Sequence, residues 1–176
     1  MNNLIEEDPT FNPSTFISKV NNIFVMLCVS MTTNNLSRVS HFLSKELLEK
    51  KQEELDKLNS KNIIQMYDEL NVSNTFIQDI QILDDRYQIK VLLSSKYLDY
   101  RIDKDTKKIV DGNNKSRIEK NYILFFEKKK DSKKLKEIRT CPTCGSVMDI
   151  NNNGVCKYCR NVFSQEDYDW ILKDIY

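Results

Sequence analysis

Four cysteines in two CxxC pairs constrain this chain more than any other feature. The pairs are Cys141-Pro-Thr-Cys144 and Cys156-Lys-Tyr-Cys159, and they are separated by eleven residues. Two cysteines with two residues between them fit on one tight turn and can share a metal ion. Zinc prefers four tetrahedral ligands, and thiolates suit it well. We therefore predict one structural Zn²⁺ ion bound by Cys141, Cys144, Cys156 and Cys159, with no ligand position left for water or a substrate.

An oxidised cysteine pair and an iron centre are the alternatives to zinc. The chain has five cysteines and its first residues lack the basic and apolar regions of a secretory signal. Such a chain is expected in the cytoplasm, where CxxC pairs hold metal more often than they form disulfides. The longest apolar run covers residues 23–29, and a membrane span needs about 20 residues. The chain as given is therefore not expected to cross a bilayer, and membrane association in a longer natural protein stays open.

The first half of the chain has the apolar period of helices. Residues 1–12 are expected to form a flexible tail, and Asn12-Pro13-Ser14 is typical of a helix start. An apolar stripe at helical spacing follows: Phe16, Val20, Ile23, Phe24 and Leu27. Ser44 is expected to begin a charged helix whose buried face is Leu47, Leu48, Leu55 and Leu58. We expect further helical turns through Met66 and Leu70, ending near Asn71.

The second half of the chain changes to the two-residue period of strands. We expect strands over residues 76–83, from Tyr87 to Ile102, over 108–111 and over 118–126, with turns between them. Helices followed by antiparallel strands predict an α+β fold, with the N-terminal helices packed on one face of a curved sheet. The last segment, residues 168–175, has apolar spacing that fits either a strand or a helix.

The charges are balanced overall and clustered locally. Lysine and arginine total 27 and aspartate and glutamate total 26, so binding to nucleic acid is disfavoured. The N-terminus is acidic at residues 6–8. A basic cluster consists of Lys128, Lys129, Lys130, Lys133 and Lys134. Such runs are usually only solvated; the alternative is a binding site for an anionic surface, such as lipid head groups or nucleic acid.

Catalytic groups are scarce in the sequence. His41 is the only histidine, so a Ser-His relay or a histidine-based metal site lacks its parts. Asp79 and Asp99 are the carboxylates we would name for acid–base chemistry in a pocket. Tyr97 and Tyr100, with Tyr122, either line a pocket inside the curved sheet or fill the core. We expect the protein not to be an enzyme, and a small-ligand binder or an enzyme that uses the pocket stays as the alternative.

Three stretches resemble the bacterial members of the Tim44-like family, and the likeness covers residues 14–176. The first is DYRIDKDTKKIVDG, which contains Asp99, Tyr100, Asp103, Thr106 and Gly112; the second is the pair of knuckles CPTCG and CKYC; the third is YDWIL with Ile175. The resemblance implies a cone-shaped fold similar to nuclear transport factor two and cystatin, with a concave pocket.

The resemblance also implies a domain organisation and a function. The cone domain would cover residues 13–138, the zinc ribbon 139–163, and the last strand of the sheet would lie within 164–176. Family members of known function are mostly adaptors. We therefore expect a non-catalytic binding or adaptor module with a protein partner. An anionic membrane surface and a small ligand in the cone pocket are further candidate partners.

Overall fold

Helix α2 (Pro13–Thr32) begins within the Asn12-Pro13-Ser14 stretch, where the sequence predicts a helix start. In a computed structural model, residues 2–130, 132, 156, 158 and 169–176 are described. The Asn12 side chain accepts a hydrogen bond from the backbone N–H of Thr15 at 2.9 Å, which caps the helix, and Pro13 occupies its first position. The predicted stripe is buried: Phe16, Val20, Ile23, Phe24 and Leu27. This face packs against the sheet.

Helix α3 (Lys45–Ser60) is also capped as expected. The Ser44 hydroxyl accepts a hydrogen bond from the backbone N–H of Leu47 at 3.2 Å. Of the four predicted leucines, Leu47 and Leu55 are buried and Leu48 and Leu58 are half-buried, and most of the charged residues are exposed. Two short 3-10 turns, η1 (Leu36–Arg38) and η2 (Ser40–Phe42), connect α2 to α3.

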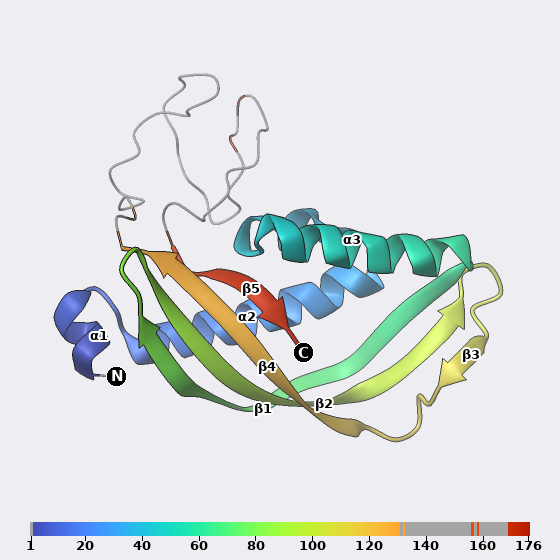
Figure 1. Cartoon of the computed structure of the whole chain (residues 1–176). Coiled ribbons are helices and arrows are strands. Elements are labelled where there is room, and N and C mark those ends of the chain that lie inside the picture. The colour runs from blue at the N-terminus through green and yellow to red at the C-terminus, as the bar shows by residue number, and fades with distance from the viewer. Residues whose placement is uncertain (1, 131, 133–155, 157, 159–168) are drawn as a thin grey trace.

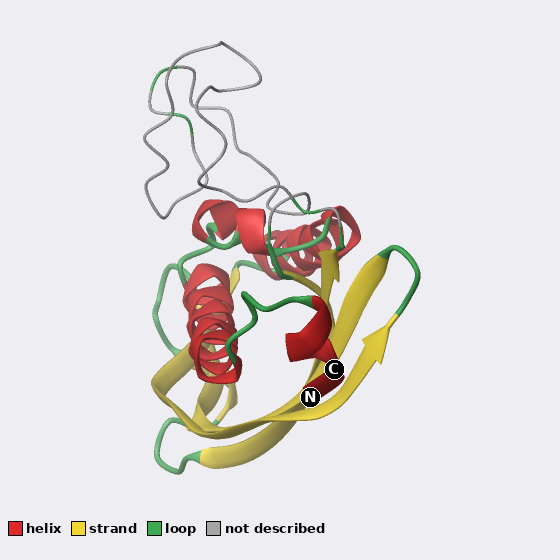
Figure 2. Cartoon of the chain, turned by 90° about the vertical axis from the view of Figure 1, so that its left-hand side faces the viewer, coloured by secondary structure: helices red, strands yellow, loops and turns green. Residues whose placement is uncertain are grey.

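A long antiparallel sheet bends around helix α2. The strand order is β1-β2-β4-β5, and β3 pairs with the far end of β2. The strands are β1 (Ile63–Ile82), β2 (Arg86–Asp103), β3 (Ile109–Gly112), β4 (Ile118–Lys129) and β5 (Ile171–Ile175). Figure 1 shows α2 along the concave side of the sheet and α3 above it. The view turned by 90° shows both helices on the same side of the sheet (Figure 2). The predicted α+β architecture is confirmed.

Strand β1 replaces the helical turns expected through Leu70, so that prediction is wrong. The strand pairs with β2 along its whole length, from Ile63 opposite Asp103 to Ile82 opposite Tyr87. Its register with β2 shifts at three places, the first between Asp68 and Asn71. Because each extra residue reverses the faces of the side chains that follow, the two-residue period is lost. The first part of β1 therefore shows no strand alternation, whereas the strand predicted over residues 76–83 overlaps the end of β1.

The N-terminal residues form structure where a flexible tail was expected. Helix α1 (Asn2–Glu7) places the Leu4 side chain in the core with no exposed surface, and Phe11 is 7% exposed. The Phe11 ring packs against those of Phe16 on helix α2 and Trp170, and Asp8 pairs with Lys128, which lies 120 residues away in sequence. The secondary-structure propensities of residues 1–12 are local properties and do not predict these long-range contacts.

The end of the chain is a strand, as the family resemblance implies. Strand β5 pairs antiparallel with β4, with Leu172 opposite Phe126 and Ile175 opposite Leu124. The helical alternative for residues 171–175 is wrong. Trp170 directly precedes the strand and is buried.

Helix α2 is also apolar enough for a membrane span by length and composition. It is the one such helix among the described residues. Core helices of water-soluble proteins meet the same measure. Here the helix packs against β1, and eight of its side chains are buried.

Candidate functional site

The predicted zinc ligands fall mainly outside the described residues. Cys141, Cys144 and Cys159 lie there, as do Lys133 and Lys134 of the basic cluster. Cys156 is described, and its side chain is 2% exposed. The zinc ion therefore stays a prediction, and the structure shows how the chain on either side of these cysteines is held.

Both ends of the cysteine-containing segment are fixed at one end of the sheet. Strand β4 ends at Lys129 and strand β5 begins at Ile171, which lies opposite Glu127. Paired strands lie about 4.8 Å apart. The chain thus leaves and re-enters the sheet at neighbouring positions (Figure 1).

The end of β4 is tied to the acidic N-terminus. The Lys128 ammonium donates to Asp8 Oδ2 at 2.5 Å, and the two side chains are only 15% and 11% exposed. Lys130 Nζ lies 3.0 Å from Glu7 Oε2 and 5.4 Å from the centre of the Tyr87 ring. Two lysines of the predicted anion-binding cluster are therefore neutralised within the chain. The acidic and basic clusters seen separately in the sequence pair with each other.

The Asp8 carboxylate responds to this environment. Burial alone would raise the pKa of Asp8, but hydrogen bonds from Lys128 and Thr10 and the Lys128 charge outweigh it and lower that pKa. Asp8 is thus held ionised, which keeps the N-terminal segment against the end of β4.

The residues that precede β5 form a second anchor. Trp170 packs in an aromatic cluster, with ring centres 5.1 Å from Phe16, 5.8 Å from Phe11 and 6.4 Å from Tyr87. Asp169 Oδ2 lies 2.5 Å from Lys19 Nζ on helix α2. Burial lowers the pKa of Lys19, and the Asp169 charge opposes this shift. The sequence places Trp170 in the last segment but does not show these partners.

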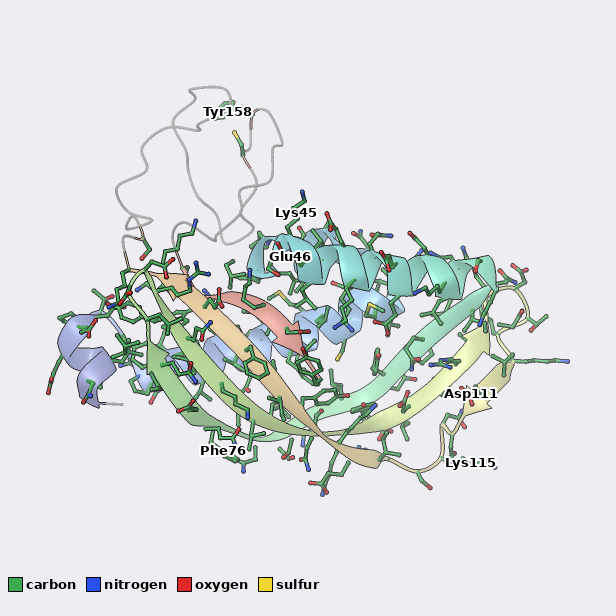
Figure 3. The ribbon with its side chains drawn as sticks, viewed as in Figure 1. Lys45, Glu46, Phe76, Asp111, Lys115 and Tyr158 are labelled. Atoms are coloured by element: carbon green, nitrogen blue, oxygen red, sulfur yellow. The ribbon has the colours of Figure 1, made fainter. Side chains whose placement is uncertain are left out.

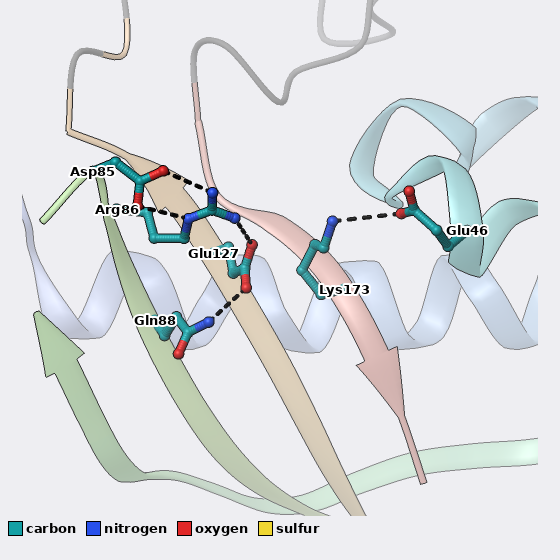
Figure 4. Close-up of polar contacts among 6 residues, drawn as sticks. All are labelled: Glu46, Asp85, Arg86, Gln88, Glu127 and Lys173. Carbon is teal, nitrogen blue, oxygen red and sulfur yellow. Dashed lines mark hydrogen bonds and ion pairs between the residues drawn. The ribbon is translucent and has the colours of Figure 1, made fainter. Parts of the chain in front are cut away.

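Two separate sets of polar contacts lie beside these anchors (Figure 4). Arg86 donates to Asp85 at 3.0 and 2.7 Å and to Glu127 at 3.2 Å, and Gln88 donates to Glu127 at 2.6 Å. Lys173 lies 3.5 Å from Glu46, which links β5 to α3. These contacts join two basic groups, Arg86 and Lys173, to three acidic groups, Asp85, Glu127 and Glu46. They crosslink neighbouring elements and do not form a site of one charge.

The concave side of the sheet is filled by aromatic side chains. Tyr97 has no exposed surface, and its hydroxyl is hydrogen-bonded to that of Tyr122. The Tyr122 ring centre lies 4.8 Å from that of Phe24 on α2, and the Tyr67 ring lies 5.5 Å from Tyr97. Burial raises the pKa of both Tyr97 and Tyr122. The sequence left open whether these tyrosines line a pocket or fill the core. Tyr97 fills the core.

The candidate acids and Tyr100 have structural partners. Asp99 Oδ1 accepts a hydrogen bond from Gln65 Nε2 at 2.7 Å, and Gln65 also accepts one from Arg101 at 3.0 Å. The Tyr100 hydroxyl donates to Asp68. Asp79 is exposed on β1 and accepts a hydrogen bond from Gln81 at 3.2 Å. The structure does not bring Asp79 and Asp99 together, since they lie on different parts of the sheet.

The DYRIDKDTKKIVDG stretch builds a turn. Asp103 Oδ1 accepts hydrogen bonds from the backbone N–H groups of Asp105 and Thr106 at 3.1 and 2.7 Å. Gly112 has a φ of +78°, and a Cβ there would lie 2.4 Å from the Asp99 carbonyl oxygen. These residues therefore fix the β2–β3 turn.

The chain is similar to one protein family over most of its length. The model of the Tim44-like domain matches residues 1–138. Among solved structures, the chain is similar to the intermembrane space region of chloroplast protein ARC6, at 7% identity and a TM-score of 0.48. That similarity covers 91% of this chain and 94% of the other. No curated protein matches the chain.

Proposed function

We propose, since this chain belongs to the Tim44-like domain family, that it works by binding another protein and not by catalysis. Tim44-like domains are generally non-catalytic binding modules. One observation from this structure carries the proposal. Tyr97, Tyr122 and Phe24 pack together on the concave side of the sheet, where a cone fold would otherwise offer a ligand pocket. Outer surfaces are then the parts of the domain that meet a partner.

We also propose that Cys141, Cys144, Cys156 and Cys159 hold one structural zinc ion in a ribbon inserted between β4 and β5. Support comes from the ligand spacing and from the pairing of β4 with β5, which fixes both ends of the insertion. Structural zinc contributes folding free energy directly, because the ligands are not preorganised without it. The zinc would stabilise the ribbon, and the sheet would set its position on the domain.

The test of protein binding uses the full chain purified with zinc. The chain would be immobilised and exposed to a native lysate of its source cells at moderate and high salt. Each retained protein would then be titrated against the chain in solution. A saturable one-to-one complex with micromolar or tighter affinity supports the proposal. Finding no saturable protein partner at either salt concentration would overturn it.

A parallel flotation experiment separates protein binding from membrane binding. Vesicles of neutral and of anionic lipid would be mixed with the chain at low and high salt. Flotation confined to anionic vesicles at low salt would assign a membrane-peripheral role to the basic cluster. Because Lys128 and Lys130 pair with Asp8 and Glu7, we expect no flotation.

A further inference from the structure

An acidic helix at the N-terminus lies on a basic site of the same chain. Helix α1 and the residue that follows it cover residues 2–8 and carry acidic side chains at their C-terminal end. Asp8 Oδ2 lies 2.5 Å from Lys128 Nζ, and Glu7 Oε2 lies 3.0 Å from Lys130 Nζ. Figure 1 shows α1 at the end of the sheet where β4 ends. We name residues 2–8 the N-terminal latch.

The N-terminal latch lies outside the sheet and has little stability of its own. Helix α1 has six residues, whereas isolated helices shorter than about 12 to 15 residues are marginal in water. Its conformation therefore depends on docking, through the buried Leu4 side chain and the two ion pairs. Because the latch contributes no strand, it can detach while every strand pairing remains, as a local opening of the fold.

The lysine that the latch covers requires an anion. The side chains of Lys128 and Asp8 are only 15% and 11% exposed, so the pair is mostly shielded from water. Burial is the main cause of the lowered pKa of Lys19; Asp169 opposes this shift, and the nearby Lys128 charge adds to it. Removing one partner of a buried ion pair is strongly destabilising, because the other charge is left without compensation. Whatever replaces the latch must therefore bring a negative charge to Lys128.

The latch also shows which side-chain spacing the site accepts. The backbone N–H of Asp8 donates to the carbonyl of Leu4 at 2.8 Å, so the two residues lie one helical turn apart on the same face. Leu4 has no exposed surface and belongs to the core cluster. The site thus takes an apolar side chain followed by carboxylates three and four residues later, as in Leu4, Glu7 and Asp8. Nucleic acid has no such apolar side chain, and a membrane surface does not enter a site shielded from water.

We propose that the N-terminal latch is an intramolecular ligand, and that it occupies a binding site for an acidic helical segment of a partner protein with the same side-chain spacing. The proposal rests on the protein-binding function proposed above and adds a site and a control of access to it. Tethering beside the site gives the latch an effective concentration in roughly the millimolar range. The partner binds only molecules whose latch is detached, so its apparent affinity is reduced by that fraction.

A peptide with the sequence of residues 2–9, blocked at both ends and carrying a fluorescent label, is the probe. It is titrated against the full wild-type chain and against a latch variant, Leu4→Ser with Asp8→Asn, both purified with zinc. The latch variant weakens the intramolecular contact and leaves Lys128 in place. Circular dichroism and the urea midpoint establish that each chain is folded. We expect the peptide to bind the latch variant at least ten-fold more tightly than wild type.

An exchange of charges tests the contact itself. Lys128→Glu, added to the latch variant, should abolish binding of the peptide, and a peptide with Asp8→Lys should bind that chain instead. Lys115→Glu in the latch variant is the matched control, because Lys115 is exposed and lies at the opposite end of the sheet from α1 (Figure 3). It should leave the affinity for the original peptide unchanged. A purely structural role of the latch would not produce this exchange.

No saturable binding of the peptide to the folded latch variant up to about 1 mM would overturn the proposal. So would equal affinity for wild type and latch variant, or binding that Lys128→Glu leaves unchanged. Self-association of wild type that the latch variant abolishes would also overturn it, because the latch would then occupy a second copy. A native partner retained equally by wild type and latch variant would keep the proposed function and overturn only this site, whereas stronger retention by the latch variant supports both.

Discussion

Replacing Trp170 by alanine tests whether the residue that precedes β5 is a structural anchor. The Trp170 side chain is 5% exposed and packs against Phe11, Phe16 and Tyr87 at ring-centre distances of 5.1 to 6.4 Å. Truncating a buried tryptophan or phenylalanine to alanine costs about 3–5 kcal/mol, which includes the cavity left behind. Three aromatic contacts place this site in the upper half of that range. We expect a loss of about 4 kcal/mol in the free energy of unfolding.

Urea unfolding of the zinc-loaded chain measures this loss. With a slope of about 2 kcal/mol per molar urea, the midpoint should fall by about 2 M. Tyr158→Ala is the matched control, because Tyr158 is 74% exposed and exposed substitutions usually change stability by less than about 0.5 kcal/mol. Zinc content is measured in both variants, so that a change in metal occupancy is not read as lost packing.

A small effect would refute this reasoning. If Trp170→Ala lost less than about 1 kcal/mol, or no more than the Tyr158 variant, the aromatic cluster would not hold the start of β5. A lower slope with an unchanged midpoint would indicate a change in the unfolded or native ensemble instead of a lost anchor.

Three further predictions follow from single sites. Gly112→Ala should destabilise the chain by about 2 kcal/mol or more, because its φ is +78° and the new Cβ meets the Asp99 carbonyl; thermal unfolding checks this, with Val110→Ala as a neutral control. Asp8→Asn should lower stability at neutral pH. Because the pKa of Asp8 is lowered in the folded chain, its contribution is present above 3.8 and is lost as the pH falls below it, so unfolding curves of the variant and wild type should converge at low pH. Cys156→Ser should reduce bound zinc from one ion per chain to nearly none by metal analysis. Cys28→Ser should leave the zinc content unchanged, because burial on α2 raises the pKa of the Cys28 thiol to about 12 and keeps it protonated.

The sequence predicts those elements whose period is regular. Helix α2 has a continuous stripe and a capping residue, and β2 alternates strictly from Tyr87 to Tyr97. The first part of strand β1 is not predicted, because its register shifts remove the alternation and because Met66 and Leu70 happen to have helical spacing. The two-residue hydrophobic period therefore identifies a strand only where the strand pairs with its neighbour without a bulge.

Ion pairs between residues far apart in the chain are a second feature that the sequence does not predict. The acidic residues 6–8 and the lysines 128–130 are both visible in the sequence, but their pairing across about 120 residues is not. Each cluster taken alone predicts a solvated face or an anion-binding surface. The fold determines which applies, because the N-terminal segment runs beside the end of β4 only once Leu4 and Phe11 are in the core.

The curvature of the sheet decides which face remains for a partner. Helix α2 and the Tyr97–Tyr122 pair occupy the concave side. The outer edge of β1 has three register shifts relative to β2, and such bulges disfavour the addition of a strand from another chain. The convex face is different, because regular pairing of β2 with β4 over twelve residue pairs keeps its side chains in rows. Leu92 and Ile123 are aligned by that pairing, so the regularity that stabilises the sheet also places these apolar side chains side by side.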